Sequence, residues 1–147
     1  MKHLYIPEGS TPLQERFIST MMKRGKKSIA RKIFRESFLV MGQQNLNPEQ
    51  IFTKAIDNVK PAMEVRPKRI GGAVYQVPVE VKSNRQVALA FRWILDAARA
   101  IKGKPMGKKL ASVLIEASNG AGPAVKKKED VHKMAQANRA FAHFAKY

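Results

Sequence analysis

The residues that could carry out chemistry are few in this chain and poorly grouped. It has no cysteine, which excludes a disulfide, a thiolate metal site and a cysteine nucleophile. His132 and His143 lie eleven residues apart, about three helical turns, and one helix could not offer both to a metal. Single acids such as Glu64, Glu80 and Asp130 stand among basic residues, so they are better explained as local partners than as acid–base pairs. We therefore expect no enzyme activity, no metal and no cofactor.

One segment, residues 103–109 (GKPMGKK), is similar to a phosphate-binding loop. That motif needs four residues between its glycines and a Ser or Thr after its lysine. Here three residues separate Gly103 from Gly107, and Lys109 follows Lys108. No strand is expected before this segment, so it is interpreted as an ordinary loop that leads into a helix.

The strongest chemical signal is positive charge. The 147 residues include 28 Lys and Arg against 11 Asp and Glu, a formal net charge of +17, while 44% of residues are hydrophobic. This apolar content supports a single folded domain, residues 1–147, and the uncompensated charge indicates a polyanion partner. Net charges of +6, +6 and +5 fall on residues 1–60, 61–105 and 106–147, so no segment is a separate basic tail. No apolar run approaches the ~18–20 residues of a membrane span, and no membrane partner is expected.

Basic side chains recur at helical spacing. Lys27, Arg31 and Arg35 follow one another at four-residue steps, and a second set recurs at seven-residue steps, namely Arg85, Arg92 and Arg99. A cationic stripe along a helix can follow a phosphate backbone. A solvated helix face is the alternative, and Asp96 lies where it could pair with the second set. Several stripes together with so few acids favour nucleic acid. His132, Gln136, Arg139 and His143 are expected on one face of the last helix.

These stripes need a mainly helical scaffold. Apolar spacing, caps and breakers predict six helices at about 12–23, 27–42, 48–59, 84–101, 108–118 and 128–145. Asn47 and Pro48 mark the start of the third helix, and Met134 and Phe141 are expected to face inward from the last one. Residues 62–82 differ, because two runs rich in valine flank Gly71 and Gly72, which predicts a β-hairpin. Pro67 and Pro78 argue against a central strand. We expect a bundle-like body, residues 12–61 and 83–147, with a projecting two-stranded ribbon between helices three and four and a short N-terminal arm, residues 1–11.

The predicted ribbon is itself basic. Arg66, Lys68 and Arg69 stand just before its glycine tip. A projecting basic ribbon can reach a groove or an RNA strand that the body cannot touch. The alternative is an edge ribbon that charge keeps soluble, and the binding role is preferred because both strands are too polar to be buried on two faces.

Three long segments resemble the family of small-subunit ribosomal protein seven. They are residues 58–82 (NVKPAMEVRPKRIGGAVYQVPVEVK), 88–99 (ALAFRWILDAAR) and 124–144 (AVKKKEDVHKMAQANRAFAHF). Residues 25–28 (GKKS) also fit, and the resemblance covers nearly the whole chain from about residue 12. Three motifs in the right order make the resemblance very specific.

The resemblance implies a six-helix body with a ribbon, and a structural role in the ribosome. It implies primary binding to the 3′ major domain of small-subunit ribosomal RNA, nucleation of head assembly, and neighbours among the head and platform proteins. The ribosomal-RNA surface would comprise Lys26, Lys27, Arg31, Arg35, Arg85, Arg92, Arg99, Lys108, Lys109, Lys126, Lys127, Lys128, His132, Arg139 and His143. The ribbon would line the exit site for tRNA and mRNA through Arg66, Lys68, Arg69, Gly71, Gly72 and Tyr75.

Both ends depart from the family pattern. The first residues, MKHLYIPEGSTP, contain only Lys2 where bacterial members carry an arginine-rich arm. Residues 145–147 stand where many members have an Arg-Trp ending or a longer tail that reaches a platform protein. The sequence of residues 124–144 is similar to that of the alphaproteobacterial and mitochondrial members of the family. A mitochondrial ribosome is therefore the expected location, with a plastid or the bacterial cytoplasm as alternatives.

A different class of function stays open. An architectural DNA-binding protein could insert a basic ribbon into a groove, with Ile70 as the apolar wedge. Such a protein would usually dimerise through an apolar face, and no spare face is evident in the pattern.

Overall fold

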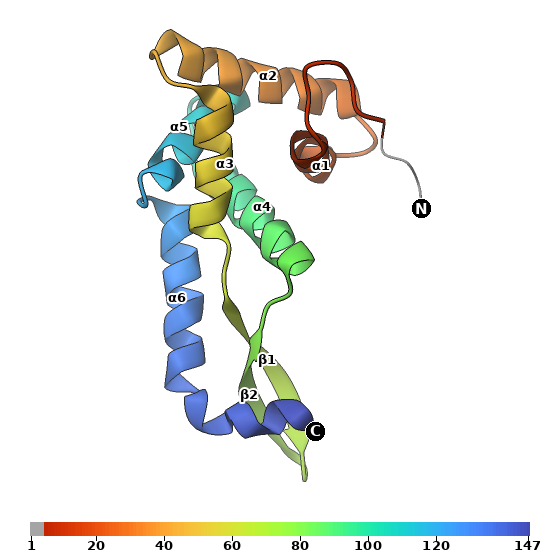
Figure 1. The fold of residues 1–147 in the computed structure, drawn as a ribbon, viewed down its shortest axis with the longest axis vertical. Helices are drawn as coiled ribbons and strands as arrows, with labels where there is room; N and C mark the ends of the chain where they lie inside the picture. The colour runs from red at the N-terminus through yellow and green to blue at the C-terminus, as the bar shows by residue number, and fades with distance from the viewer. Residues whose placement is uncertain (1–4) are drawn as a thin grey trace.

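The computed structural model describes residues 5–147 and is mainly helical, as predicted (Figure 1). Lys2, with the rest of residues 1–4 of the predicted arm, lies outside the described residues. The elements are α1 (Pro12–Met21), α2 (Lys27–Gln43), α3 (Pro48–Val59), β1 (Met63–Ile70), β2 (Ala73–Glu80), α4 (Ser83–Ala100), α5 (Met106–Ser118), α6 (Pro123–Ala137) and a 3₁₀ helix, η1 (Arg139–Lys146). Within the described residues no helix has the length and apolar character needed to span a membrane.

The body is built around one phenylalanine. Phe17 of α1 is fully buried, and its ring centroid lies 5.8, 5.3 and 5.0 Å from those of Phe34, Phe52 and Phe91 on α2, α3 and α4. The last two contacts are edge-to-face, the arrangement that aromatic quadrupoles favour. α5 packs against α2, α3 and α4. This shared core fixes the directions in which the helices present their outer faces.

The ribbon between α3 and α4 is a two-stranded antiparallel sheet, as predicted. Gly71 and Gly72 have φ of +58° and +85°, and a two-residue hairpin turn with both central residues at positive φ requires this freedom. The sheet has only two strands, so each strand has one unpaired edge. Pro67 and Pro78, which have no N–H to donate, are tolerated in such edge strands. Lys68 stands opposite Tyr75, and the two share one face.

The end of the chain differs from the prediction. The last α-helix covers Pro123–Ala137 rather than 128–145, because Gly122 at φ +90° and Pro123 begin it earlier. It ends where the Asn138 side chain donates a hydrogen bond of 2.9 Å to the carbonyl of Met134. Met134, expected inward, is 54% exposed.

The ribbon is braced rather than isolated. Figure 1 shows α6 running beside the ribbon and the chain then crossing it, and contacts join α6 to β1 and η1 to β2. Tyr75 lies 5.2 and 4.9 Å from Phe141 and Phe144, between ring centroids. Phe141, expected to face the body, therefore packs against the ribbon.

Candidate nucleic-acid interface

A cationic corner forms where α1 ends, α2 begins and α4 ends. Lys23, Lys26 and Arg99 line a hollow of about 270 Å³ there, and no carboxylate is among the lining residues described. Arg99 is held in place because its guanidinium donates a 3.4 Å hydrogen bond to the carbonyl of Met21. Lys26 and Arg99 were predicted, and the structure brings them together. Lys23 was missed, although four basic residues among 23–27 were a visible signal.

The helix N-termini divide into two kinds. α1 and α3 are capped by the side chains of Thr11 and Asn47, and each carries a glutamate in its first turn. α2, α4, α5 and α6 have neither a side-chain cap nor a first-turn acid. Their first turns or caps instead carry predicted cations, which are Lys26 and Lys27, Arg85, Lys108 and Lys109, and Lys126. A cation opposes the positive end of a helix dipole. At α5 and α6 the carboxylates of Glu36 and Glu116 lie beside Gly107 and Gly122, at the start of each helix.

Two predicted cations on α2 are engaged inside the protein. Arg31 donates to both carboxylate oxygens of Glu15, with Nη2 at 2.8 Å from Oε2, and Ser10 donates to the same carboxylate at 2.8 Å. Glu15 is fully buried, and Lys27 Nζ lies 3.8 Å from its Oε2. The hydrogen bond from Arg31 holds the pKa of Glu15 below its ordinary value. Arg35 is exposed, so the predicted stripe is split between a structural role and a solvent-facing one.

A second ion-pair cluster joins α4 to the ribbon. Arg85 donates to both oxygens of Glu64, with Nε–Oε1 at 2.8 Å and Nη2–Oε2 at 3.0 Å, and Arg66 Nε donates to Oε1 at 3.1 Å. Hydrogen bonding from Arg85 lowers the pKa of Glu64. Arg92 is exposed, and no ion pair to Asp96 appears among the described side chains.

His132 supports the base of the ribbon. Its Nε2 accepts a 3.0 Å hydrogen bond from the backbone N–H of Ala62, just before β1. Burial, with a smaller contribution from Lys128, lowers the pKa of His132, so the ring is neutral at pH 7 and its Nδ1 carries the proton. Arg139 and His143 lie on η1, so the single face predicted for all three is wrong because α6 ends at Ala137.

The basic run of α6 lies in a different element from the one predicted. Lys126, Lys127 and Lys128 were expected before the last helix, and the structure places them inside it, near its N-terminus. Lys126 and Lys127 are exposed, while Lys128 is half-buried. Their side chains are therefore held on a rigid helix rather than on a loop.

The ribbon presents two unlike faces. On one face Lys68 donates from Nζ to the carbonyl of Ala145 at 3.4 Å, beside Tyr75. Arg69 lies opposite Val74 on the other face, where Arg69 is exposed and Val74 is 58% exposed. Among the residues that the structure describes, the cation left free near the tip is Arg69, on the face that η1 does not cover.

The comparisons with known proteins decide the family. Residues 2–139 match the family model described as ribosomal protein S7p/S5e. The chain belongs to this family. It is 52% identical over 135 residues to small ribosomal subunit protein uS7 of Chloroflexus aurantiacus, covering 91% of this chain and 86% of that protein. The protein of the same name from Fervidobacterium nodosum is 56% identical over 133 residues, covering 90% and 86%. That of Roseiflexus sp. strain RS-1 is 50% identical over 142 residues, covering 96% and 90%.

Membership of the S7p/S5e family has two consequences. The chain is a structural constituent of the ribosome and not an enzyme, as the poor grouping of reactive residues indicated. The relatives named above are bacterial, so they do not support the mitochondrial location that residues 124–144 indicated.

Proposed function

We propose that this protein binds the 3′ major domain of small-subunit ribosomal RNA directly and nucleates assembly of the subunit head. The observation that carries the proposal is the corner lined by Lys23, Lys26 and Arg99, where three helix ends supply cations without a carboxylate among the lining residues. Exposed lysines at the N-termini of α5 and α6, Lys108 and Lys126, extend this surface over the body. The mechanism is neutralisation of closely packed phosphates by a rigid helical scaffold, with little reading of bases.

We assign the exit-site role to the tip of the ribbon and to the face that carries Arg69. Arg66 and Lys68 are engaged with Glu64 and with the carbonyl of Ala145. Arg69, Gly71 and Gly72 are exposed beyond the bracing contacts. Contacts to tRNA and mRNA therefore come from the tip and the uncovered face, whereas Tyr75 acts by holding the ribbon.

The salt dependence of RNA affinity tests the body surface. The double variant Lys26→Ala/Arg99→Ala should weaken binding to a 3′-domain transcript and reduce the slope of log K against log salt by about 1.5, since each lost phosphate contact contributes roughly 0.7–0.9. The matched control is Lys54→Ala, because that exposed lysine lies beside Glu49 and Asp57. An affinity that does not change with salt, or equal slopes for both variants, would contradict the proposal.

The ribbon assignment has a separate test. Arg69→Ala should leave the affinity for the 3′-domain transcript within about twofold, because the ribbon is not part of the body surface. The same variant should alter exit-site tRNA occupancy or reading-frame maintenance in reconstituted ribosomes. Loss of primary RNA binding in this variant would show that the two roles are not divided between body and ribbon.

The identity of the ribosome and of the protein neighbours belongs to the same proposal. The bacterial relatives favour a ribosome of bacterial type over a mitochondrial one. Head and platform proteins are the expected neighbours, and the family match favours this ribosomal role over the architectural DNA-binding alternative.

A further inference from the structure

The turn between α1 and α2 has an unusual residue at its centre. The backbone N–H of Lys26 donates a 3.1 Å hydrogen bond to the carbonyl of Lys23, which closes a four-residue β-turn. Its two central residues, Arg24 and Gly25, have φ of +54° and +73°. Positive φ at both positions is characteristic of a type I′ turn, which prefers asparagine, aspartate or glycine at the first of them. Arginine therefore occupies a position that its Cβ makes unfavourable.

The chain follows the usual preference at its other left-handed positions. Among the described residues, the one other non-glycine residue with positive φ is Asn45, at +59°, and asparagine tolerates that conformation. The remaining positive-φ residues are glycines. Arg24 is exposed, and the described part of the chain contains no ion pair to it. Neither packing nor a charge partner inside the protein therefore explains an arginine at this position.

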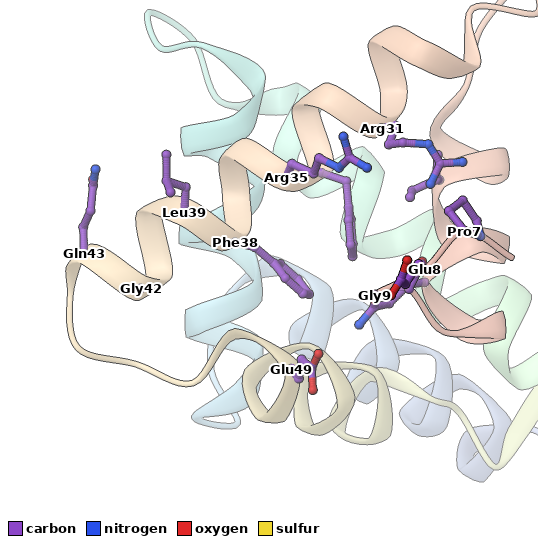
Figure 2. Close-up of a pocket in the computed structure, with 14 residues that line it drawn as sticks. Pro7, Glu8, Gly9, Arg31, Arg35, Phe38, Leu39, Gly42, Gln43 and Glu49 are labelled. Atoms are coloured by element: carbon purple, nitrogen blue, oxygen red, sulfur yellow. The ribbon is translucent and has the colours of Figure 1, made fainter.

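The local charge is a second reason why an arginine is unfavourable in the free protein. Residues 23–27 contain four cations and no acid. Figure 2 shows a different arrangement further along α2, where Arg35 lies around the same hollow as Glu8 and Glu49. At the turn, an arginine adds a charge that its neighbours in the sequence repel. A bound polyanion offsets that repulsion, whereas nothing in residues 23–27 does.

We propose that Arg24 binds a phosphate of the RNA and that the rigid turn presents it. The inference rests on the proposed function and deepens it, because it adds a contact that is held by a turn rather than by a helix face. The turn adjoins the cationic corner, to which it contributes Lys23 and Lys26. A hydrogen-bonded turn fixes the backbone that carries the guanidinium, so little backbone freedom is lost on binding. A guanidinium can donate two parallel hydrogen bonds to one phosphate, which a lysine ammonium cannot match.

Two substitutions separate the charge from the backbone conformation. Arg24→Asn introduces a preferred residue of a type I′ turn and removes the charge. Arg24→Lys keeps the charge and the unfavourable conformation but removes the planar guanidinium. Both variants are made in the full chain, and two quantities are measured: the affinity for a 3′-domain transcript over a salt series, and the urea midpoint of unfolding. The matched control is Lys54→Ala, which removes an exposed charge from α3.

Arg24→Asn should raise the urea midpoint and at the same time weaken RNA binding. Loss of one phosphate contact reduces the slope of log K against log salt by roughly 0.7–0.9, which is about sixfold in affinity at 0.1 M salt. Arg24→Lys should keep the native slope and urea midpoint and bind about two- to threefold more weakly, because the paired hydrogen bonds are lost. Lys54→Ala should leave the affinity and the slope unchanged.

Two results would overturn the inference. One is a native affinity and slope in Arg24→Asn, since the arginine would then make no contact with RNA. The other is a lower urea midpoint in Arg24→Asn, since the arginine would then serve the stability of the turn. A native protein whose affinity does not change with salt, or an unchanged slope in Lys26→Ala/Arg99→Ala, is a separate result: the proposed function itself then fails, and the inference falls with it.

Discussion

The buried carboxylate of Glu15 should be a major determinant of stability. Glu15→Gln keeps the side-chain volume but removes the charge that faces Arg31, and Arg31 is left with a guanidinium whose side chain is only 19% exposed. Removing one partner of a buried ion pair costs roughly 3–5 kcal/mol, and the partial exposure of Arg31 puts the value near about 3 kcal/mol. For a domain of this size such a loss lowers Tm by roughly 6–12 °C.

The assay is thermal and urea unfolding followed by circular dichroism at constant salt. The matched control is Glu49→Gln, because Glu49 also occupies the first turn of a capped helix but is exposed. That control measures the helix-dipole contribution alone, under about 1 kcal/mol. A double-mutant cycle with Arg31→Ala isolates the pair. Equal losses in the two glutamine variants would refute the reasoning, since the ion pair would then add nothing to stability.

Three further predictions concern acid, packing and the ribbon. Folding lowers the pKa values of Glu15 and Glu64. Their contribution to the free energy of unfolding is therefore complete above the ordinary value of 4.5 and is lost as pH falls through the folded values. In a pH series of urea midpoints, the Glu15→Gln variant should lose less stability below pH 4.5 than the native protein. Gly107→Ala should destabilise by about 1–3 kcal/mol in urea unfolding, because its Cβ would lie 2.8 Å from a Cβ of α2, whereas Gly42→Ala, with open space around it, should not be destabilising. Tyr75→Ala should speed hydrogen exchange at the β2 amides without changing exchange in α1, and unchanged β2 exchange would show that the aromatic contacts do not brace the ribbon.

The sequence predicted the elements whose signals are local. Asn47 and Pro48 marked the start of α3, and the glycine pair marked the hairpin turn, because capping and positive φ are properties of a few adjacent residues. The last helix was misplaced for the opposite reason. Phe141 continued an apolar pattern, and only its contact with Tyr75, far away in the chain, shows that the pattern belongs to a separate segment.

The candidate interface was predicted in composition but not in detail. Helical spacing correctly grouped the cations of α2, yet it could not show that Arg31 is held by Glu15, because that partner lies on another helix. The same limit hid the bond from Ala62 to His132. Lys23 and Arg99 meet only because α1 and α4 share the core around Phe17.

The bracing of the ribbon also sets an order of events during synthesis. The buried core cluster includes no residue after Val125, so the body can close before η1 leaves the translating ribosome. The hydrogen bond from Lys68 to Ala145 spans 77 residues of chain. At a synthesis rate of about 5–20 residues per second, the segment that covers Tyr75 is made roughly 4–15 s after the ribbon. Each new copy therefore passes through a stage in which its body is ready for RNA while one side of its ribbon is still bare.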